Sequence, residues 1–177
     1  AGMGETTPLL LATRQLEKTP AQLDILRMLP DAGADPNSRD GGDLPLVAAI
    51  YVSREAGIEP VRMLLKAGAR PNQLDRWGTP AFFAASAFDV EILRLLLDSG
   101  ADLNLTRSGG MGPLLDAINT NNWKVVLLML ERGADWRKFK TTNGQNLLER
   151  LESEARGQGA SEELAEVIHF VKARASQ

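Results

Sequence analysis

The chain has 177 residues, 44% of them hydrophobic, which is typical of a single folded domain and argues against a disordered segment. Its 20 basic and 23 acidic residues leave a net charge of −3, so no strong field points to nucleic acid or to an anionic membrane surface. The absence of cysteine excludes disulfides, thiolate zinc sites and a cysteine nucleophile.

The N-terminal residues 1–5 lack the basic and apolar segments of a secretion signal. Two origins stay open: a cytoplasmic protein with a short non-native extension before Met3, or a periplasmic protein whose leader has been removed. No apolar run approaches the roughly 18 residues that cross a membrane. We therefore expect no membrane insertion, and the sequence leaves the localisation unknown.

A first helix pair is predicted within residues 5–39. The Thr-Pro pair at 7–8 starts its first helix, because the fixed φ and missing N–H of proline suit the first helical turn. The second helix is predicted over residues 21–29, with the threonine of a second Thr-Pro pair at 19–20 as its N-cap. Pro30 is expected to make the last turn of this helix irregular.

Two further helix pairs are predicted within residues 40–74 and 75–107. In the earlier pair, residues 53–59 are expected to form an extended connection, and Pro60 is expected to begin the second helix. In the later pair, Gly100 ends a helix where a left-handed residue is needed. The apolar residues of that helix recur at helical spacing: Ile92, Leu93, Leu96 and Leu97.

A fourth pair is predicted within residues 108–140, followed by a final pair within residues 143–175. The first helix of the final pair should end near residues 157–159, and Ser161 should cap its second helix. One face of that last helix is apolar and the other is charged; its apolar residues are Leu164, Val167, Ile168 and Val171. A terminal unit with a polar outer side is what a stacked array needs as its cap.

Gly-Ala pairs begin at residues 33, 68, 100 and 133, a period of about 33 residues. Together with the Thr-Pro helix starts, this period resembles that of the ankyrin repeat, which consists of a β-turn and two helices. The resemblance covers about residues 5–175 and implies an all-α repeat fold, an α-solenoid. In it, ankyrin-like helix-turn-helix repeats joined by β-turn or hairpin loops would stack as one domain over residues 1–177, a small stand-alone array of bacterial type.

The sequence departs from the T-P-L-H pattern of the family. The histidine is replaced in each of the four repeats, by Leu10, Val47, Phe82 and Leu115. The leading threonine is kept only at Thr7 and Thr79. Since these side chains usually make hydrogen bonds between loops, we expect most such bonds to be missing and the stack to be held chiefly by apolar packing.

No motif for catalysis or for cofactor binding stands out. His169 is the only histidine, and it has no neighbouring metal ligand or nucleophile. The glycine-rich segment 108–113 lacks the Gly-Lys-Ser/Thr ending of a phosphate-binding loop. The acidic residues Glu149, Glu152 and Glu154 lie on a helix that is expected to be exposed. We therefore predict no enzyme activity, no cofactor and no bound metal.

The resemblance implies instead that a partner protein binds the concave face, which is formed by loop tips and first helices. Carrying over the variable positions of the family gives a predicted binding set: Arg14, Arg39, Asp40, Tyr51, Val52, Asp75, Arg76, Trp77, Ser86, Arg107, Met111, Asn119, Lys138 and Phe139. Trp77, Tyr51 and Arg76 are the expected anchors, because aromatic residues and arginine dominate binding energy in interfaces. Phe139 could instead pack under the last repeat, and the remaining tryptophans, Trp123 and Trp136, are predicted to be packing residues.

These features predict a non-catalytic protein–protein interaction module. One concrete version is a bacterial inhibitor or immunity protein that occludes a toxin or effector enzyme, a role suggested by the small and apparently complete chain. The alternatives are an adaptor or chaperone scaffold, or a structural protein that self-assembles through its first repeat. The chain is expected to be monomeric alone and to bind no nucleic acid.

Overall fold

The computed structural model describes residues 7–16, 19–39, 42–75, 78–86, 89–106, 112–141 and 143–175. The elements within these residues are helices, in the order α1 (Pro8–Arg14), α2 (Pro20–Asp31), α3 (Pro45–Ala56), α4 (Glu59–Lys66), α5 (Pro80–Ser86), α6 (Val90–Asp98), α7 (Pro113–Asn119), α8 (Trp123–Glu131), the 3₁₀ turn η1 (Trp136–Lys138), α9 (Leu147–Gln158) and α10 (Glu162–Ala175).

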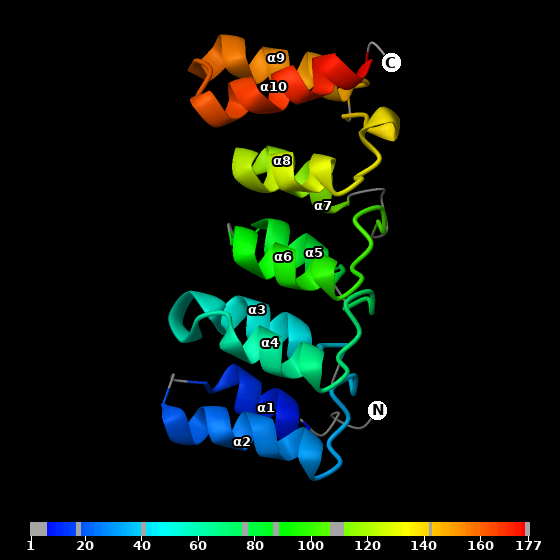
Figure 1. Ribbon diagram of the computed structural model, residues 1–177. Helices are drawn as coiled ribbons and strands as arrows, with labels where there is room; N and C mark the ends of the chain where they lie inside the picture. The colour runs from blue at the N-terminus through cyan, green and yellow to red at the C-terminus, as the bar shows by residue number, and fades with distance from the viewer. Residues whose placement is uncertain are drawn as a thin grey trace.

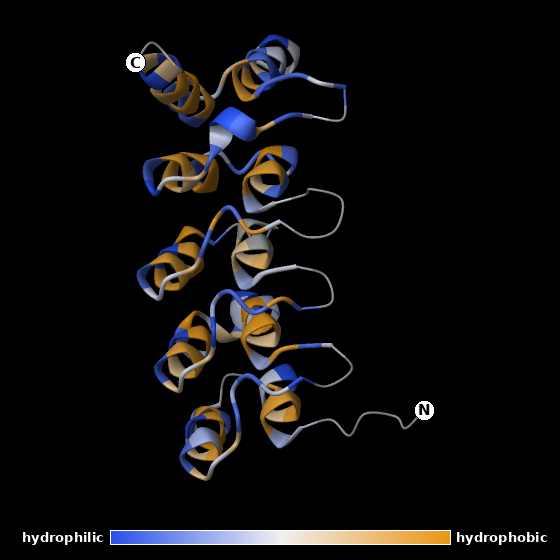
Figure 2. Cartoon of the chain, turned by 90° about the vertical axis from the view of Figure 1, so that its right-hand side faces the viewer, coloured by the Kyte–Doolittle hydropathy of each residue, from blue (hydrophilic) through white to orange (hydrophobic). Residues whose placement is uncertain are grey.

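The helices stack as pairs along one axis, with α1 and α2 at one end of the stack and α9 and α10 at the other (Figure 1). Seen end-on, the helices form two columns (Figure 2). The column of first helices packs α1 on α3, α3 on α5 and α5 on α7, while the column of second helices runs from α2 through α4, α6 and α8 to α10. The connecting loops reach past the column of first helices. The predicted all-α repeat stack is confirmed.

Local sequence explains where the helices begin. The Thr19 side chain accepts a hydrogen bond from the N–H of Gln22 at 3.3 Å, and the Gln22 side chain lies 3.4 Å from the Thr19 N–H, which completes a capping box. Asn146 and Glu149 form the same arrangement at the start of α9. Local sequence also explains where helices end. After the C-terminal end of α6, Gly100 adopts a φ of 87°, the left-handed conformation that glycine enters without strain.

The extended connection predicted over residues 53–59 is wrong. Helix α3 continues to Ala56, because the Ser53 hydroxyl donates to the Ile50 carbonyl at 2.6 Å. The hydroxyl thus has a hydrogen-bond partner within the helix and does not interrupt it. The Gly57 N–H closes the last turn by donating to the Ser53 carbonyl at 2.7 Å. Two residues then separate α3 from α4.

The irregular turn predicted at Pro30 is also wrong. Helix α2 runs one residue past Pro30, to Asp31, and the Ala32 N–H still donates to the Met28 carbonyl at 2.9 Å. Proline at this position removes only one helical N–H donor close to the helix end, so the remaining bonds hold the turn.

The hydrophobic core lies between the two columns and extends along the whole stack. Its largest fully buried side chains come from the paired helices: Leu9, Leu10, Leu26, Leu46, Ile50, Leu64, Ile92, Leu93, Leu96, Ile118, Met129 and Leu147. Trp123 and Trp136 pack against this core, as predicted. The core is therefore shared by neighbouring pairs, and the pairs stabilise one another.

The final pair closes the stack. Residues Leu164, Val167 and Val171 of α10 are at most 3% exposed, and α10 packs on both α8 and α9. The Ser161 hydroxyl accepts the Leu164 N–H at 3.2 Å, which confirms the predicted cap. Helix α9 ends at Gln158, within the range predicted for its end.

Candidate partner-binding face

A ladder of asparagine side chains ties each loop to the next. The side-chain oxygens of Asn37, Asn72 and Asn104 accept backbone N–H groups of Arg70, Asp102 and Asp135, each at 2.7 Å. Polar bonds between loops therefore join the repeats in addition to the apolar core. The signal was present in the sequence: each asparagine follows the glycine of a Gly-Ala pair by four positions.

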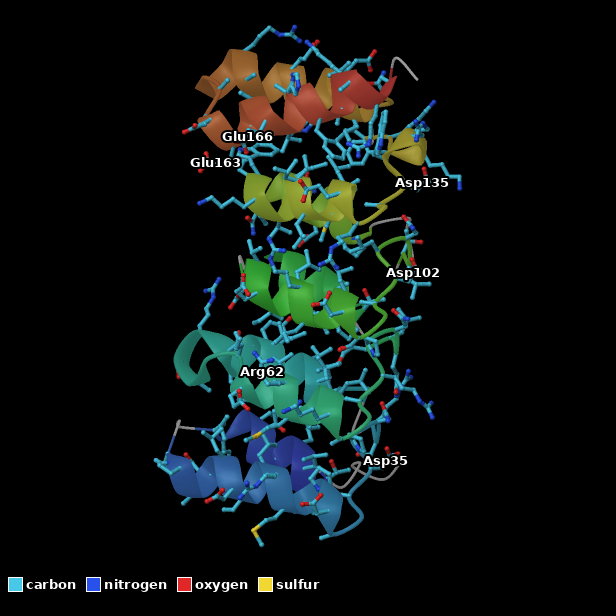
Figure 3. All side chains as sticks on the ribbon, viewed as in Figure 1. Asp35, Arg62, Asp102, Asp135, Glu163 and Glu166 are labelled. Carbon is cyan, nitrogen blue, oxygen red and sulfur yellow. The ribbon has the colours of Figure 1, made fainter. Side chains whose placement is uncertain are left out.

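Two further features fix the ladder in place. The amide groups of Asn37 and Asn72 donate to the carbonyls of Gly68 and Gly100, at 3.0 and 2.9 Å. Asp35 and Asp102, both labelled along the loop edge in Figure 3, lie two residues before Asn37 and Asn104 and accept their backbone N–H groups, at 2.9 and 2.8 Å. The loops are thus pre-organised before any partner arrives.

The ladder ends at Arg137, which occupies the asparagine position after Gly133. Its guanidinium donates to the Arg174 carbonyl at 3.3 Å, at the end of α10, and lies over the Trp136 ring with 4.8 Å to the ring centroid. This contact joins the fourth loop to the terminal helix pair.

Outward residues of the first helices form a row across the stack. Arg14, Tyr51, Ser86 and Asn119 each lie six residues after the proline that starts their helix, so they occupy equivalent positions. Arg14 and Asn119 are exposed, and Tyr51 is 63% exposed. Val52 is half-buried beside Tyr51. Three of the predicted binding residues, Arg14, Tyr51 and Asn119, therefore have exposed side chains at equivalent positions along the column of first helices.

Tyr51 borders a cleft of about 280 Å³ between the first two pairs. Its lining consists of Arg14, Asp43, Leu44, Val47, Ala48, Tyr51, Val52 and Asp75. Arg14 forms an ion pair with Asp43 at one edge. The Tyr51 ring leans on Phe83 of the next pair, with 5.3 Å between the ring centroids and 59° between their planes. Neither Asp43 nor Phe83 was predicted, because their positions depend on how successive repeats stack.

Asp75 lines this cleft, but its side chain serves the fold. The residue is 8% exposed, and its carboxylate accepts the Leu44 N–H at 3.1 Å, while its own N–H donates to the Gly78 carbonyl at 2.7 Å. The first bond joins two neighbouring loops, and the second closes a turn within the loop of Asp75 itself. We therefore remove Asp75 from the residues expected to contact a partner directly.

The remaining described residues of the predicted set have different surroundings. The exposed Arg39 donates to the Leu74 carbonyl at 2.7 Å and so bridges two loops. Lys138 lies 2.8 Å from Asp135; this hydrogen bond lowers the pKa of Asp135 and raises the pKa of Lys138. Phe139 is 9% exposed and belongs to the core, so its prediction as a partner-binding residue is corrected in favour of the alternative, inward packing.

Five residues of the predicted set lie outside the described residues: Asp40, Arg76, Trp77, Arg107 and Met111. Ser86 ends α5, but its side chain is likewise outside the description. Trp77 and Arg76 as anchors therefore stay predictions from the sequence. Tyr51 is the predicted anchor whose geometry the structure gives.

The pKa of the Tyr51 phenol is raised by burial first and then by the nearby Asp75 and Asp116 carboxylates. Tyr51 is the only tyrosine, so phenolate absorbance reports on it alone. We expect a titration midpoint above the ordinary value of about 10. Because folding favours the protonated phenol, its contribution to stability is present below about pH 10 and is lost as the pH rises through the raised midpoint.

Asp116→Asn is expected to lower this midpoint, since it removes one of the two carboxylates. Glu166→Gln on α10, at the far end of the stack in Figure 3, is the matched control and should leave the midpoint unchanged. A midpoint equal to that of a free tyrosine derivative would contradict the assigned surroundings.

The described residues contain no group of three or more histidine, cysteine, aspartate or glutamate side chains placed to hold a metal ion. His169 is exposed on α10. Among the helices that the structure describes, none is long and apolar enough to cross a membrane.

A family model described as ankyrin repeats (3 copies) matches residues 46–140, more than half of the chain. The chain is an ankyrin-repeat protein. The ankyrin arrangement continues beyond the matched residues, because α1 and α2 pack on α3 and α4 in the same way as the later pairs. Ankyrin repeats generally act as protein–protein interaction modules, and the family is typically non-catalytic. A search among curated proteins finds no match.

Proposed function

We propose that this ankyrin-repeat protein binds another protein through the concave face formed by its first helices and loop tips. The single observation that carries the proposal is Tyr51. A large aromatic side chain stands 63% exposed in the middle of the row of first helices, supported from behind by Phe83 and bordering a cleft. Aromatic side chains in such positions supply much of the binding energy of interfaces.

The polar surroundings of Tyr51 would set the orientation of the partner. Arg14 and Asp43 lie together at one edge of the cleft, and Asn119 and Thr120 extend the row at the other end. Mixed charges at the rim of an interface contribute more to specificity and association rate than to affinity. The asparagine ladder keeps these residues in fixed relative positions, so little ordering is needed on binding.

The specific role that we propose is inhibition: the protein would act as an immunity or inhibitor protein that occludes a toxin or effector enzyme. A rigid complementary surface is sufficient for occlusion, and no catalytic group is needed on the inhibitor. An adaptor or chaperone scaffold for a partner is the second version of the same binding mode.

The test starts with capture of a stoichiometric partner and continues with its affinity for three variants. Tyr51→Ala is expected to weaken binding at least about tenfold, as the loss of an aromatic anchor does. Trp77→Ala is expected to have an effect of similar size. Lys66→Ala is the matched control, because Lys66 is exposed in the same repeat but lies on the second helix, and it should change affinity less than about twofold.

Unchanged affinity of Tyr51→Ala together with weaker binding of Lys66→Ala would place the interface on the second helices and refute the proposal. The captured partner then decides the role. If the partner is an enzyme, equimolar addition of this protein should abolish its activity; undiminished activity in the complex would exclude inhibition and favour the adaptor role.

A further inference from the structure

The first helix pair exposes apolar side chains on the end of the stack. Leu11 of α1 is 44% exposed, and Ile25 and Met28 of α2 are 51% and 62% exposed. These three residues form what we call the N-terminal end face. They account for most of the large hydrophobic residues that are exposed in the described part of the chain, the others being Tyr51 and Leu74.

The equivalent positions in later repeats show what this face is built to contact. Each residue in the Ile25 position lies eight residues before the glycine of its Gly-Ala pair. The residues there in the next three repeats are Pro60, Ile92 and Val125, and all three are buried. In those repeats the preceding helix pair covers the position, since α2 packs on α4, α4 on α6 and α6 on α8.

The Leu11 position faces in the same direction. Its equivalent in the third repeat is Phe83, which lies three residues after the proline that starts α5, as Leu11 follows Pro8 in α1. Phe83 reaches back to Tyr51 of the preceding repeat and is 5% exposed. Leu11 therefore points to where a preceding helix pair would lie, and an apolar helix pair is the element that fits the end face.

We propose that a second copy of this chain covers the N-terminal end face, so that two first repeats pack head to head in a symmetric dimer. This differs from the monomer expected from the sequence and develops the alternative of self-assembly through the first repeat. Ile25 and Met28 are one helical turn apart, and a two-fold axis between them places Ile25 of one copy against Met28 of the other. Asp24 and Arg27 lie next to the pair along α2, form an ion pair with each other at 2.8 Å and stay exposed, so each can also face the opposite charge of a second copy. Their opposite charges make the rim of the face complementary to itself.

The opposite end of a second copy, formed by α9 and α10, would fit the N-terminal end face poorly. In the described residues, none of the large exposed hydrophobic side chains lies on α9 or α10. The exposed residues there are mostly charged or polar, such as Glu149, Arg156, Glu162, Glu166 and Lys172. Head-to-tail contact would bury these charges against apolar residues, which is unfavourable. The end face therefore favours head-to-head contact, which gives a closed dimer, over head-to-tail contact, which gives an open filament.

Sedimentation velocity over a wide range of concentrations tests the proposal without any partner protein. The mass of the purified chain should rise from 19.2 kDa at low concentration towards twice that value. Ile25→Glu and Met28→Glu should each raise the dimer dissociation constant at least about 100-fold, because a carboxylate is buried without a partner. Their far-UV circular dichroism should not change, since both positions are exposed in the single chain.

Leu74→Glu is the matched control. Leu74 is 46% exposed and apolar, but it lies in a loop away from the end face, so dimerisation should be retained. A second readout uses the absence of cysteine from the chain. The double variant I25C/M28C should form disulfide-linked dimers under mild oxidation. A monomer at every concentration, or a dimer that persists in Ile25→Glu, would overturn the proposal, whatever the outcome for the concave face.

Discussion

Replacing Ile92 by alanine is expected to lower the free energy of unfolding by about 3 kcal/mol. Ile92 is 0% exposed in α6, which packs against α4, α5 and α8. Truncation removes buried methyl and methylene groups and leaves a cavity that rigid neighbouring helices cannot fill. The change is measured by urea denaturation followed by circular dichroism, with linear extrapolation to water.

Ile25 offers an unusually close control, because the same residue type occupies the equivalent position in the first repeat with 51% exposure. Ile25→Ala should cost less than about 1 kcal/mol when measured at concentrations below those of the dimer. Equal losses from the two substitutions would show that Ile25 is covered within a single chain, contrary to the structure.

Asn72→Ala is expected to lower the free energy of unfolding by about 2 kcal/mol, because it removes two hydrogen bonds worth about 0.5–1.5 kcal/mol each. The lost bonds are those to the Asp102 N–H at 2.7 Å and to the Gly100 carbonyl at 2.9 Å. Hydrogen exchange gives the site-specific measurement: the Asp102 amide should exchange faster in the variant, since it loses its acceptor.

Asn143→Ala is the control for this experiment. Asn143 is exposed, and its amide makes only a long contact of 3.5 Å with the Gln145 side chain. Its substitution should change stability by less than about 0.5 kcal/mol. Unaltered exchange at Asp102 in Asn72→Ala would refute the claim that the ladder stabilises the joint between repeats two and three.

The sequence predicted those parts of the fold that local chemistry determines. Thr19 and Pro20 start α2 as expected, and Gly100 ends α6 in the left-handed conformation, because caps and φ preferences act within a few residues. The end of α3 could not be read in this way. Ser53 favours a break or a helix depending on which backbone group its hydroxyl bonds, and its partner here, the Ile50 carbonyl, is in reach only once this turn is helical.

The candidate site was predictable to the extent that it follows the repeat period. Tyr51 lies in the row of first helices because its position after the helix-starting proline is that of Arg14 and Asn119. Its contact with Phe83 and the pairing of Arg14 with Asp43 depend on how adjacent repeats stack. The burial of Phe139 in the core that the repeats share likewise depends on how they stack.

The asparagine ladder has a consequence for how such a chain changes length. Its bonds join residues that are 30 to 33 positions apart, from one loop to the next. Contacts that reach only the adjacent unit make the architecture modular. Inserting or deleting a whole helix pair leaves the bonds between all other repeats intact. Inserting or deleting only a few residues would instead move one asparagine away from the backbone N–H and carbonyl groups that it bonds. Gene duplication in whole units is therefore the inexpensive route by which this scaffold can lengthen its recognition surface.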